Sequence, residues 1–167
     1  TPAGESVLVD SGWQRDDARD AKRILEAARQ AGLKRIDHLL TTHFHRDHFG
    51  GLGELARLIP IARFYDHGRM TELAEDRQNF PKLNEAYLAA SKGQSQALRP
   101  GQEIRLKRAT GSGPLRLQVV ASNAEALQRA GPDNPECKDA QLQKDDPTDN
   151  ARSLGFVLSF GKFRFLD

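Results

Sequence analysis

Short apolar runs and helical patterns alternate over the first 66 residues, and this alternation constrains the fold more than any other feature of the sequence. Each apolar run is short enough for a strand and ends at a turn or polar segment. Acidic residues crowd the first turn of the longer helical pattern, and Gly32 follows its last turn. Strands alternating with helices predict helices packed on a sheet, an α/β fold. We expect strands over 6–10, 35–42 and 61–66, and helices over 16–32 and 52–59.

The pattern changes in the second half of the chain. Helical propensity over 70–92 is interrupted by Pro81, with Asn79 as a candidate cap for the second piece. The segment 123–150 holds three prolines and five aspartates, so we expect a long surface excursion there. We expect short antiparallel strands over 97–98, 103–106 and 115–120, and a hairpin of 153–160 with 163–166.

Composition excludes several classes of protein. The 167 residues suit one domain, and 38% hydrophobic residues are enough for a packed core. A net charge of +2 argues against a dedicated duplex-DNA binder, which needs a concentrated basic footprint. Because Cys137 is the single cysteine, intrachain disulfides and Cys-rich zinc modules are excluded. No apolar run approaches the roughly 20 residues of a membrane-spanning helix.

Four potential metal ligands fall within six residues: His43, His45, Asp47 and His48. They follow a predicted strand directly, which places them at the carboxyl end of a strand, where α/β sheets hold their sites. Imidazole and carboxylate together suit Zn²⁺, and also Fe or Mn. His43 and His45 can face one metal, while Asp47 and His48 can reach a second. Two metals about 3.5–4 Å apart would hold and activate a bridging water.

Two simpler interpretations of the same residues stay open. The segment could be a His-rich solvated loop without a metal. It could also hold a purely structural zinc, although such sites usually use cysteine. The spacing of the ligands and their place after a strand favour a catalytic metal site.

The segment 41–51, TTHFHRDHFGG, resembles the HxHxDH signature of the metallo-β-lactamase fold superfamily. The segment 7–12 is similar to the early strand of that fold with its Asp-x-Gly ending. More narrowly, Asn150 to Leu154 and the hairpin that follows are similar to the extracellular hydrolase domain of ComEC-type DNA-uptake proteins. The resemblance covers nearly the whole chain, and the histidine motif is its most specific part.

The resemblance implies a four-layer αββα sandwich, incomplete at both ends, over residues 1–167. It also implies a dinuclear zinc site in which His43 and His45 bind the first metal. Asp47 and His48 bind the second, and Asp47 also orients the attacking water. Asp10 would lie behind the ligands and fix an imidazole or a loop. Asn150 is the candidate for a third ligand of the first metal.

In the family, a metal-bridging Asp and a last ligating His follow the final strand of this chain. We expect both to lie beyond Asp167, because the chain ends on that predicted strand. Residue 1, in addition, is not Met. The 167 residues are therefore expected to be an internal piece. Alone they should bind at most one metal weakly and hydrolyse nothing measurably.

The resemblance implies a zinc-dependent hydrolase whose metal-activated water attacks a phosphodiester. The substrate would be a small molecule or single-stranded nucleic acid, and the compartment extracellular or periplasmic, or cytoplasmic if the narrower likeness fails. One alternative is hydrolysis of a lactone, thioester or lactam on the same fold. Another is a non-catalytic binding module with a degenerate metal site. No protein partner is inferred.

Other residues invite a functional interpretation but have a simpler one. His38 lies on the apolar pattern of a strand and is predicted to be a core histidine. We read His67 as a surface loop residue that could line the site, and Cys137 as an inert thiol. Trp13 and Phe44 flank the motif and could stack on a base or sugar. A solvated strand face accounts for the one local basic concentration, formed by Arg105, Lys107, Arg108 and Arg116.

Overall fold

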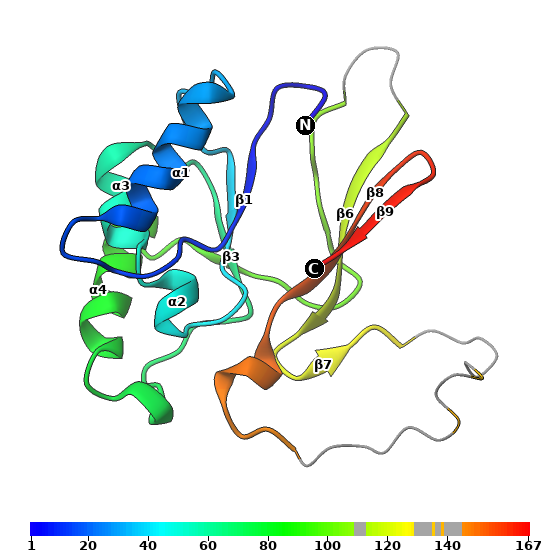
Figure 1. Ribbon diagram of the computed structural model, residues 1–167. Helices are drawn as coiled ribbons and strands as arrows, with labels where there is room; N and C mark the ends of the chain where they lie inside the picture. The colour runs from blue at the N-terminus through cyan, green and yellow to red at the C-terminus, as the bar shows by residue number, and fades with distance from the viewer. Residues whose placement is uncertain (109–112, 129–134, 136–137, 139–144) are drawn as a thin grey trace.

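The computed structural model describes residues 1–167 except 109–112, 129–134, 136–137 and 139–144. Its described residues form three layers: helices, a parallel sheet and an antiparallel sheet that faces the first (Figure 1). These layers agree with the predicted α/β class and with three layers of the implied sandwich. Among the described residues, no α-helix covers the outer face of the second sheet.

The first sheet has the strand order β1-β2-β3-β4, and every neighbouring pair is parallel. The three strands predicted in the first 66 residues are confirmed as β1, β2 and β3. We expected the segment after Gly93 to pair antiparallel. β4 instead runs parallel to β3, because helix α4 lies between them and forms a crossover. The strands are β1 (Val7–Val9), β2 (His38–Leu40), β3 (Phe64–Asp66) and β4 (Gln96–Ala97).

The helices pack on one face of this sheet (Figure 1). The predicted helix over 16–32 starts later than expected, because Ala18 takes a left-handed φ of 52° that cannot continue a helix. The predicted helix over 70–92 divides near Pro81, as expected. Asn79 precedes the second piece, but its side chain bonds to Asp76 and does not cap the helix. The helices are α1 (Arg19–Gln30), α2 (Arg46–Phe49), α3 (Leu52–Leu58), α4 (Phe80–Ser91) and the 3₁₀ turn η1 (Ala74–Asp76).

Helix α2 was not expected, and the motif itself forms it. The loop after β1 packs against its end, where the Ser11 N–H donates to the His48 carbonyl at 2.6 Å and the Gly51 N–H donates to the Gly12 carbonyl at 2.7 Å. A Cβ atom at Gly51 would collide with the Ser11 carbonyl oxygen. The glycine therefore allows two site-forming loops to lie in direct contact.

The second sheet has the order β5-β6-β8-β9, with β7 paired to β6, and is antiparallel throughout. The predicted C-terminal hairpin is confirmed as β8 and β9. Strand β9 is exposed, including Leu166 at 69%. No described helix is both long and apolar enough to cross a membrane. The strands are β5 (Glu103–Ile104), β6 (Leu115–Ser122), β7 (Glu125–Ala126), β8 (Gly155–Phe160) and β9 (Phe163–Leu166).

The segment 123–150, which we expected to be a long surface excursion, has secondary structure at its two ends. Strand β7 lies near its start, and the 3₁₀ turn η3 (Asp149–Arg152) begins at its end. Asp149 is 2% exposed, so this end of the segment joins the interior. Cys137 lies outside the described residues.

Strand β2 separates two apolar cores. Leu39 belongs to the core under the helices, together with Phe44 and Phe49 from the motif segment. Leu40 belongs to the core between the two sheets, together with Val119 of β6. Successive side chains of a strand point to opposite faces, so the loop that follows β2 starts from a buried, fixed position.

Candidate metal centre

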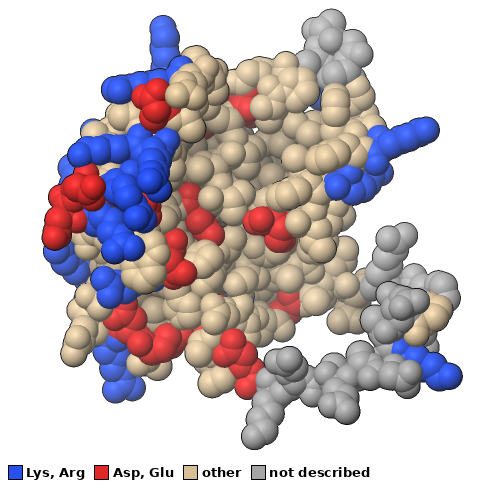
Figure 2. All heavy atoms as spheres, in the orientation of Figure 1, with Lys and Arg blue, Asp and Glu red and all other residues tan. Residues whose placement is uncertain are grey.

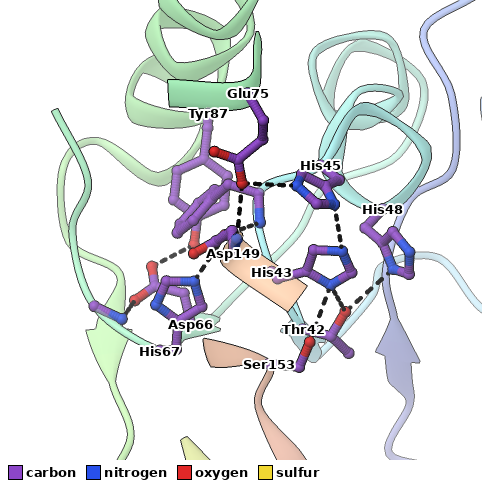
Figure 3. Close-up of polar contacts among 12 residues, drawn as sticks. Thr42, His43, His45, His48, Asp66, His67, Glu75, Tyr87, Asp149 and Ser153 are labelled. Atoms are coloured by element: carbon purple, nitrogen blue, oxygen red, sulfur yellow. Dashed lines mark hydrogen bonds and ion pairs between the residues drawn. The ribbon is translucent and has the colours of Figure 1, made fainter. Parts of the chain in front are cut away.

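The residues of the motif lie where the parallel strands end, at the edge where the two sheets meet (Figure 3). This is the edge at which α/β sheets place their sites. A cavity of about 610 Å³ opens there between the two sheets. Its polar lining includes Asp10, Thr42, His43 and His48 on one side, and Asn150, Ser153 and Asp167 on the other.

The ring nitrogens of His43 and His45 face each other. His43 Nε2 lies 3.2 Å from His45 Nδ1, and the two ring planes are nearly perpendicular, at 79°. Two nitrogens bound to one zinc at about 2.0–2.1 Å with tetrahedral angles lie about 3.3 Å apart. The spacing of this pair therefore fits two ligands of a single metal.

The hydrogen bonds around the pair determine which nitrogens carry protons. His45 Nε2 lies 3.0 Å from Glu75 Oε1, and because a carboxylate only accepts, Nε2 carries the proton. The Thr42 hydroxyl donates to Asp10 at 2.8 Å, so it accepts from His43 Nδ1, which lies 3.1 Å away. These assignments leave lone pairs on the two nitrogens that face each other.

Two lone pairs 3.2 Å apart repel unless a cation or a proton lies between them. Burial, together with the nearby His48 and His45, lowers the pKa of His43 to about 4, so its ring is neutral at pH 7. A neutral imidazole is the form that binds metal. The donor set of this pair therefore fits a metal ion.

Asp47 and His48, the candidate ligands of a second metal, lie beside the pair of His43 and His45. His48 Nε2 is 3.5 Å from Asp47 Oδ2, and the ring centroids of His43 and His48 are 3.9 Å apart. His48 Nδ1 donates to Asp10 Oδ2 at 2.6 Å, a hydrogen bond that raises the pKa of His48. Asp10 thus contacts a motif imidazole directly, at the nitrogen away from Asp47.

The four predicted ligands thus come together as two pairs. Within the described part of the chain, no group of three or more His, Cys, Asp or Glu side chains is arranged to hold one metal ion. Asn150, the candidate third ligand, lines the cavity, but its side chain is exposed and makes no hydrogen bond to His43 or His45.

Sequence reasoning missed the residues that hold the motif from behind. Asp149 accepts the Phe44 N–H at 2.7 Å, and His67 Nε2 lies 3.1 Å from the same oxygen. Hydrogen bonds from His67 and Phe44 outweigh the cost of burial and lower the pKa of Asp149. The surface interpretation of His67 is wrong, because its side chain is 1% exposed and faces this buried carboxylate. No local signal marks Asp149, which lies among other polar residues.

The structure also locates His38, Phe44 and Trp13, the other residues given an interpretation from the sequence. His38 is confirmed as a core histidine, with Nδ1 3.1 Å from the Tyr65 hydroxyl. Phe44 cannot stack on a ligand, because it is 2% exposed and packs among core aromatic rings. Trp13 is half-buried, and the guanidinium carbons of Arg15 and Arg46 lie 5.1 and 5.5 Å from its ring centroid.

Comparison with known proteins shows a family and a similar protein. The family model described as "Metallo-beta-lactamase superfamily" matches residues 1–127, which is more than half of the chain. A coenzyme F420H(2) oxidase of Methanothermobacter marburgensis is 32% identical over 82 residues. That alignment covers 48% of this chain and 19% of the oxidase, so the chain spans a small part of the relative.

Proposed function

Because the chain belongs to the metallo-beta-lactamase superfamily, we propose that it is a metal-dependent hydrolase whose activated water attacks a phosphodiester. Members of this superfamily are generally metal-dependent hydrolases. The observation that carries the proposal is the 3.2 Å separation of His43 Nε2 and His45 Nδ1, which face each other. A bound cation is the simplest way to stabilise that arrangement at neutral pH.

Each motif side chain has a role in this proposal. His43 and His45 hold the first metal, while Asp47 and His48 hold the second. When bound, zinc in the first instance, with Fe or Mn as alternatives, would supply a water of lowered pKa. Asp47, with 47% of its side chain exposed, accepts a hydrogen bond from that water and aims it at the substrate. Asp10 keeps the His48 ring in place.

Charge beside the motif supports an anionic substrate. Arg15 and Arg46 both stack on Trp13, and Arg46 belongs to the motif itself. The Arg46 guanidinium is 3.8 Å from Asp76, and 42% of the Arg46 side chain stays exposed. Two guanidiniums on one indole suit a phosphate, and the indole suits a neighbouring base. Figure 2 shows basic side chains gathered together with acidic ones on the α1 side of the molecule.

The resemblance of Asn150 to Leu154 to ComEC-type proteins adds support for a nucleic-acid-like substrate. A lactone, thioester or lactam lacks the phosphate that the arginine pair would recognise, so we place these substrates second. A non-catalytic binding module is the remaining alternative, since each metal is offered two ligands by the motif. Iron is tested as well as zinc, because imidazole and carboxylate ligands also suit Fe.

The test is an activity panel on the natural protein loaded in turn with Zn²⁺, Mn²⁺ and Fe²⁺. The substrates are bis(p-nitrophenyl) phosphate, a single-stranded oligonucleotide, a lactone and a β-lactam. We expect phosphodiester cleavage that is lost with a chelator. Arg46→Ala should raise KM with little change in kcat, whereas Arg57→Ala, on exposed α3 surface, should change neither. β-Lactam turnover without phosphodiester cleavage would reject the proposal, and full metal loading without any turnover would favour a binding module.

A further inference from the structure

We propose that Glu75 is a positioning residue that selects the metal-binding form of His45. The inference rests on the proposed function, because it takes His45 as a metal ligand. Glu75 lies on η1, thirty residues after His45, and nothing in its sequence neighbourhood marks it. Its carboxylate nevertheless approaches the motif from the side opposite the facing nitrogens (Figure 3).

One oxygen of Glu75 accepts two hydrogen bonds. His45 Nε2 donates to Oε1 at 3.0 Å, and the Asp149 backbone N–H donates to the same oxygen at 2.7 Å. The second bond fixes the carboxylate against η3, so its direction does not depend on the imidazole. A fixed acceptor at Nε2 forces the proton onto that nitrogen and leaves a lone pair on Nδ1.

Asp149, whose N–H binds the same Glu75 oxygen, also holds the backbone of the motif. Its Oδ2 accepts the N–H of Phe44, the residue between the two histidines, at 2.7 Å. Glu75 therefore holds the imidazole of His45, and Asp149 holds the backbone that carries it. Segments from η1 and η3 converge in this way on the two residues that would bind the first metal.

Without Glu75, His45 is free to place its proton on Nδ1. That proton would point at His43 Nε2 across the 3.2 Å gap and would bond the two rings to each other. A metal would then have to displace the proton. Glu75 thus favours a metal over a proton in the gap, and this effect is separate from any role in stabilising the fold.

The test compares Glu75→Ala and Glu75→Gln with Glu72→Gln as the matched control. Glu72 is exposed, lies three residues before Glu75, and makes no hydrogen bond or ion pair within the described residues. Zinc affinity is measured by competition with a chromophoric chelator. The imidazole tautomers of the metal-free protein are read from long-range ¹H–¹⁵N spectra, a readout that loss of stability alone would not change.

We expect the wild-type protein to show His45 protonated on Nε2. Glu75→Ala should show a mixture of tautomers and bind zinc about 10- to 100-fold more weakly. Glu75→Gln keeps an acceptor oxygen, so its tautomer ratio and zinc affinity should fall between those of the wild type and Glu75→Ala. Glu72→Gln should match the wild type. Should Glu75→Ala fail to fold, the isosteric Gln variant decides the question.

Wild-type tautomer and wild-type zinc affinity in a folded Glu75 variant would overturn the proposal, as would a changed tautomer with unchanged affinity. If the wild-type protein binds no zinc, the proposed function fails instead. The spectra of the metal-free protein then still decide whether Glu75 sets the tautomer of His45. The two failures are therefore distinguishable.

Discussion

At the scale of single residues, each motif imidazole gives one ring nitrogen to the protein and leaves the other available. His48 donates to Asp10, His45 to Glu75 and His43 to the Thr42 hydroxyl. Metal-binding histidines are commonly oriented by a partner at the second nitrogen. The three partners come from three different segments, so the orientation of the rings depends on the tertiary fold and not on the motif alone.

Replacing Asp10 with Asn should lower the pKa of His48 toward the ordinary histidine value. The hydrogen bond to Asp10 is the main cause of the raised pKa, ahead of the opposing effect of burial. A raised histidine pKa stabilises the folded protein at pH values below the ordinary histidine pKa. This stabilisation is lost as the pH rises through the pKa of the folded state. Asn should therefore destabilise the metal-free protein more at pH 6 than at pH 9. An NMR titration of the His48 ring with urea unfolding at both pH values checks this, and an unchanged His48 pKa would contradict it.

The motif residues could be predicted from the sequence because their chemistry is local: four potential ligands lie in six residues after a strand. Glu75 and Asp149 could not be predicted. Each is one acidic residue among many, and only the tertiary contacts distinguish them. His67 shows the same limit, because a histidine beside Gly68 looks like a loop residue until its partner across the chain is known.

At the scale of elements, two tight contacts fix the geometry of the site. The loop after β1 lies against the end of α2 through Gly51, and η3 reaches the motif through Asp149. The strands and the longer helices follow from apolar periodicity, which is why they could be predicted. The short helix α2 and the parallel pairing of β4 depend on long-range contacts, and periodicity carries no information about them.

Gly51→Ala should destabilise the fold and loosen the metal site. The added Cβ would collide with the Ser11 carbonyl oxygen, a backbone atom that cannot move without shifting the loop that carries Asp10. We expect a loss of about 1–3 kcal/mol, the usual cost of overpacking. Gly113→Ala is the control, because a Cβ there meets no atom of the described residues within 4 Å. Equal unfolding free energies for the two variants would show that the close approach does not matter.

Asp149→Ala should destabilise the protein by about 3 kcal/mol at pH 7, because it leaves the buried His67 ring and the Phe44 N–H without their partner. The lowered pKa of Asp149 means that its stabilising effect is present above the ordinary aspartate value. The effect is lost as pH falls through the folded value. Urea unfolding from pH 7 downward should show the unfolding free energies of the wild type and Asp149→Ala converging in acid. A constant difference would argue against an ionised Asp149.

At the scale of the whole molecule, the site lies where the two sheets meet. The predicted ligands come from the parallel sheet, within the 1–127 segment that matches the superfamily. Asp149 and Ser153 lie outside that segment, yet both contact the motif, Ser153 at 3.3 Å from His43 Nδ1. The turn η3 and the residues that lead from it into strand β8 therefore help to build the site.

The most direct test of the central claim is the metal content of the natural protein and of three single-residue variants, measured by inductively coupled plasma analysis. We expect at least one equivalent of metal in the wild type and its loss in His43→Ala and His45→Ala, because each change removes a facing nitrogen. His38→Gln, in the core between the sheets, should keep its metal while losing some stability. Unchanged metal content in His43→Ala and His45→Ala would show that these residues do not bind it.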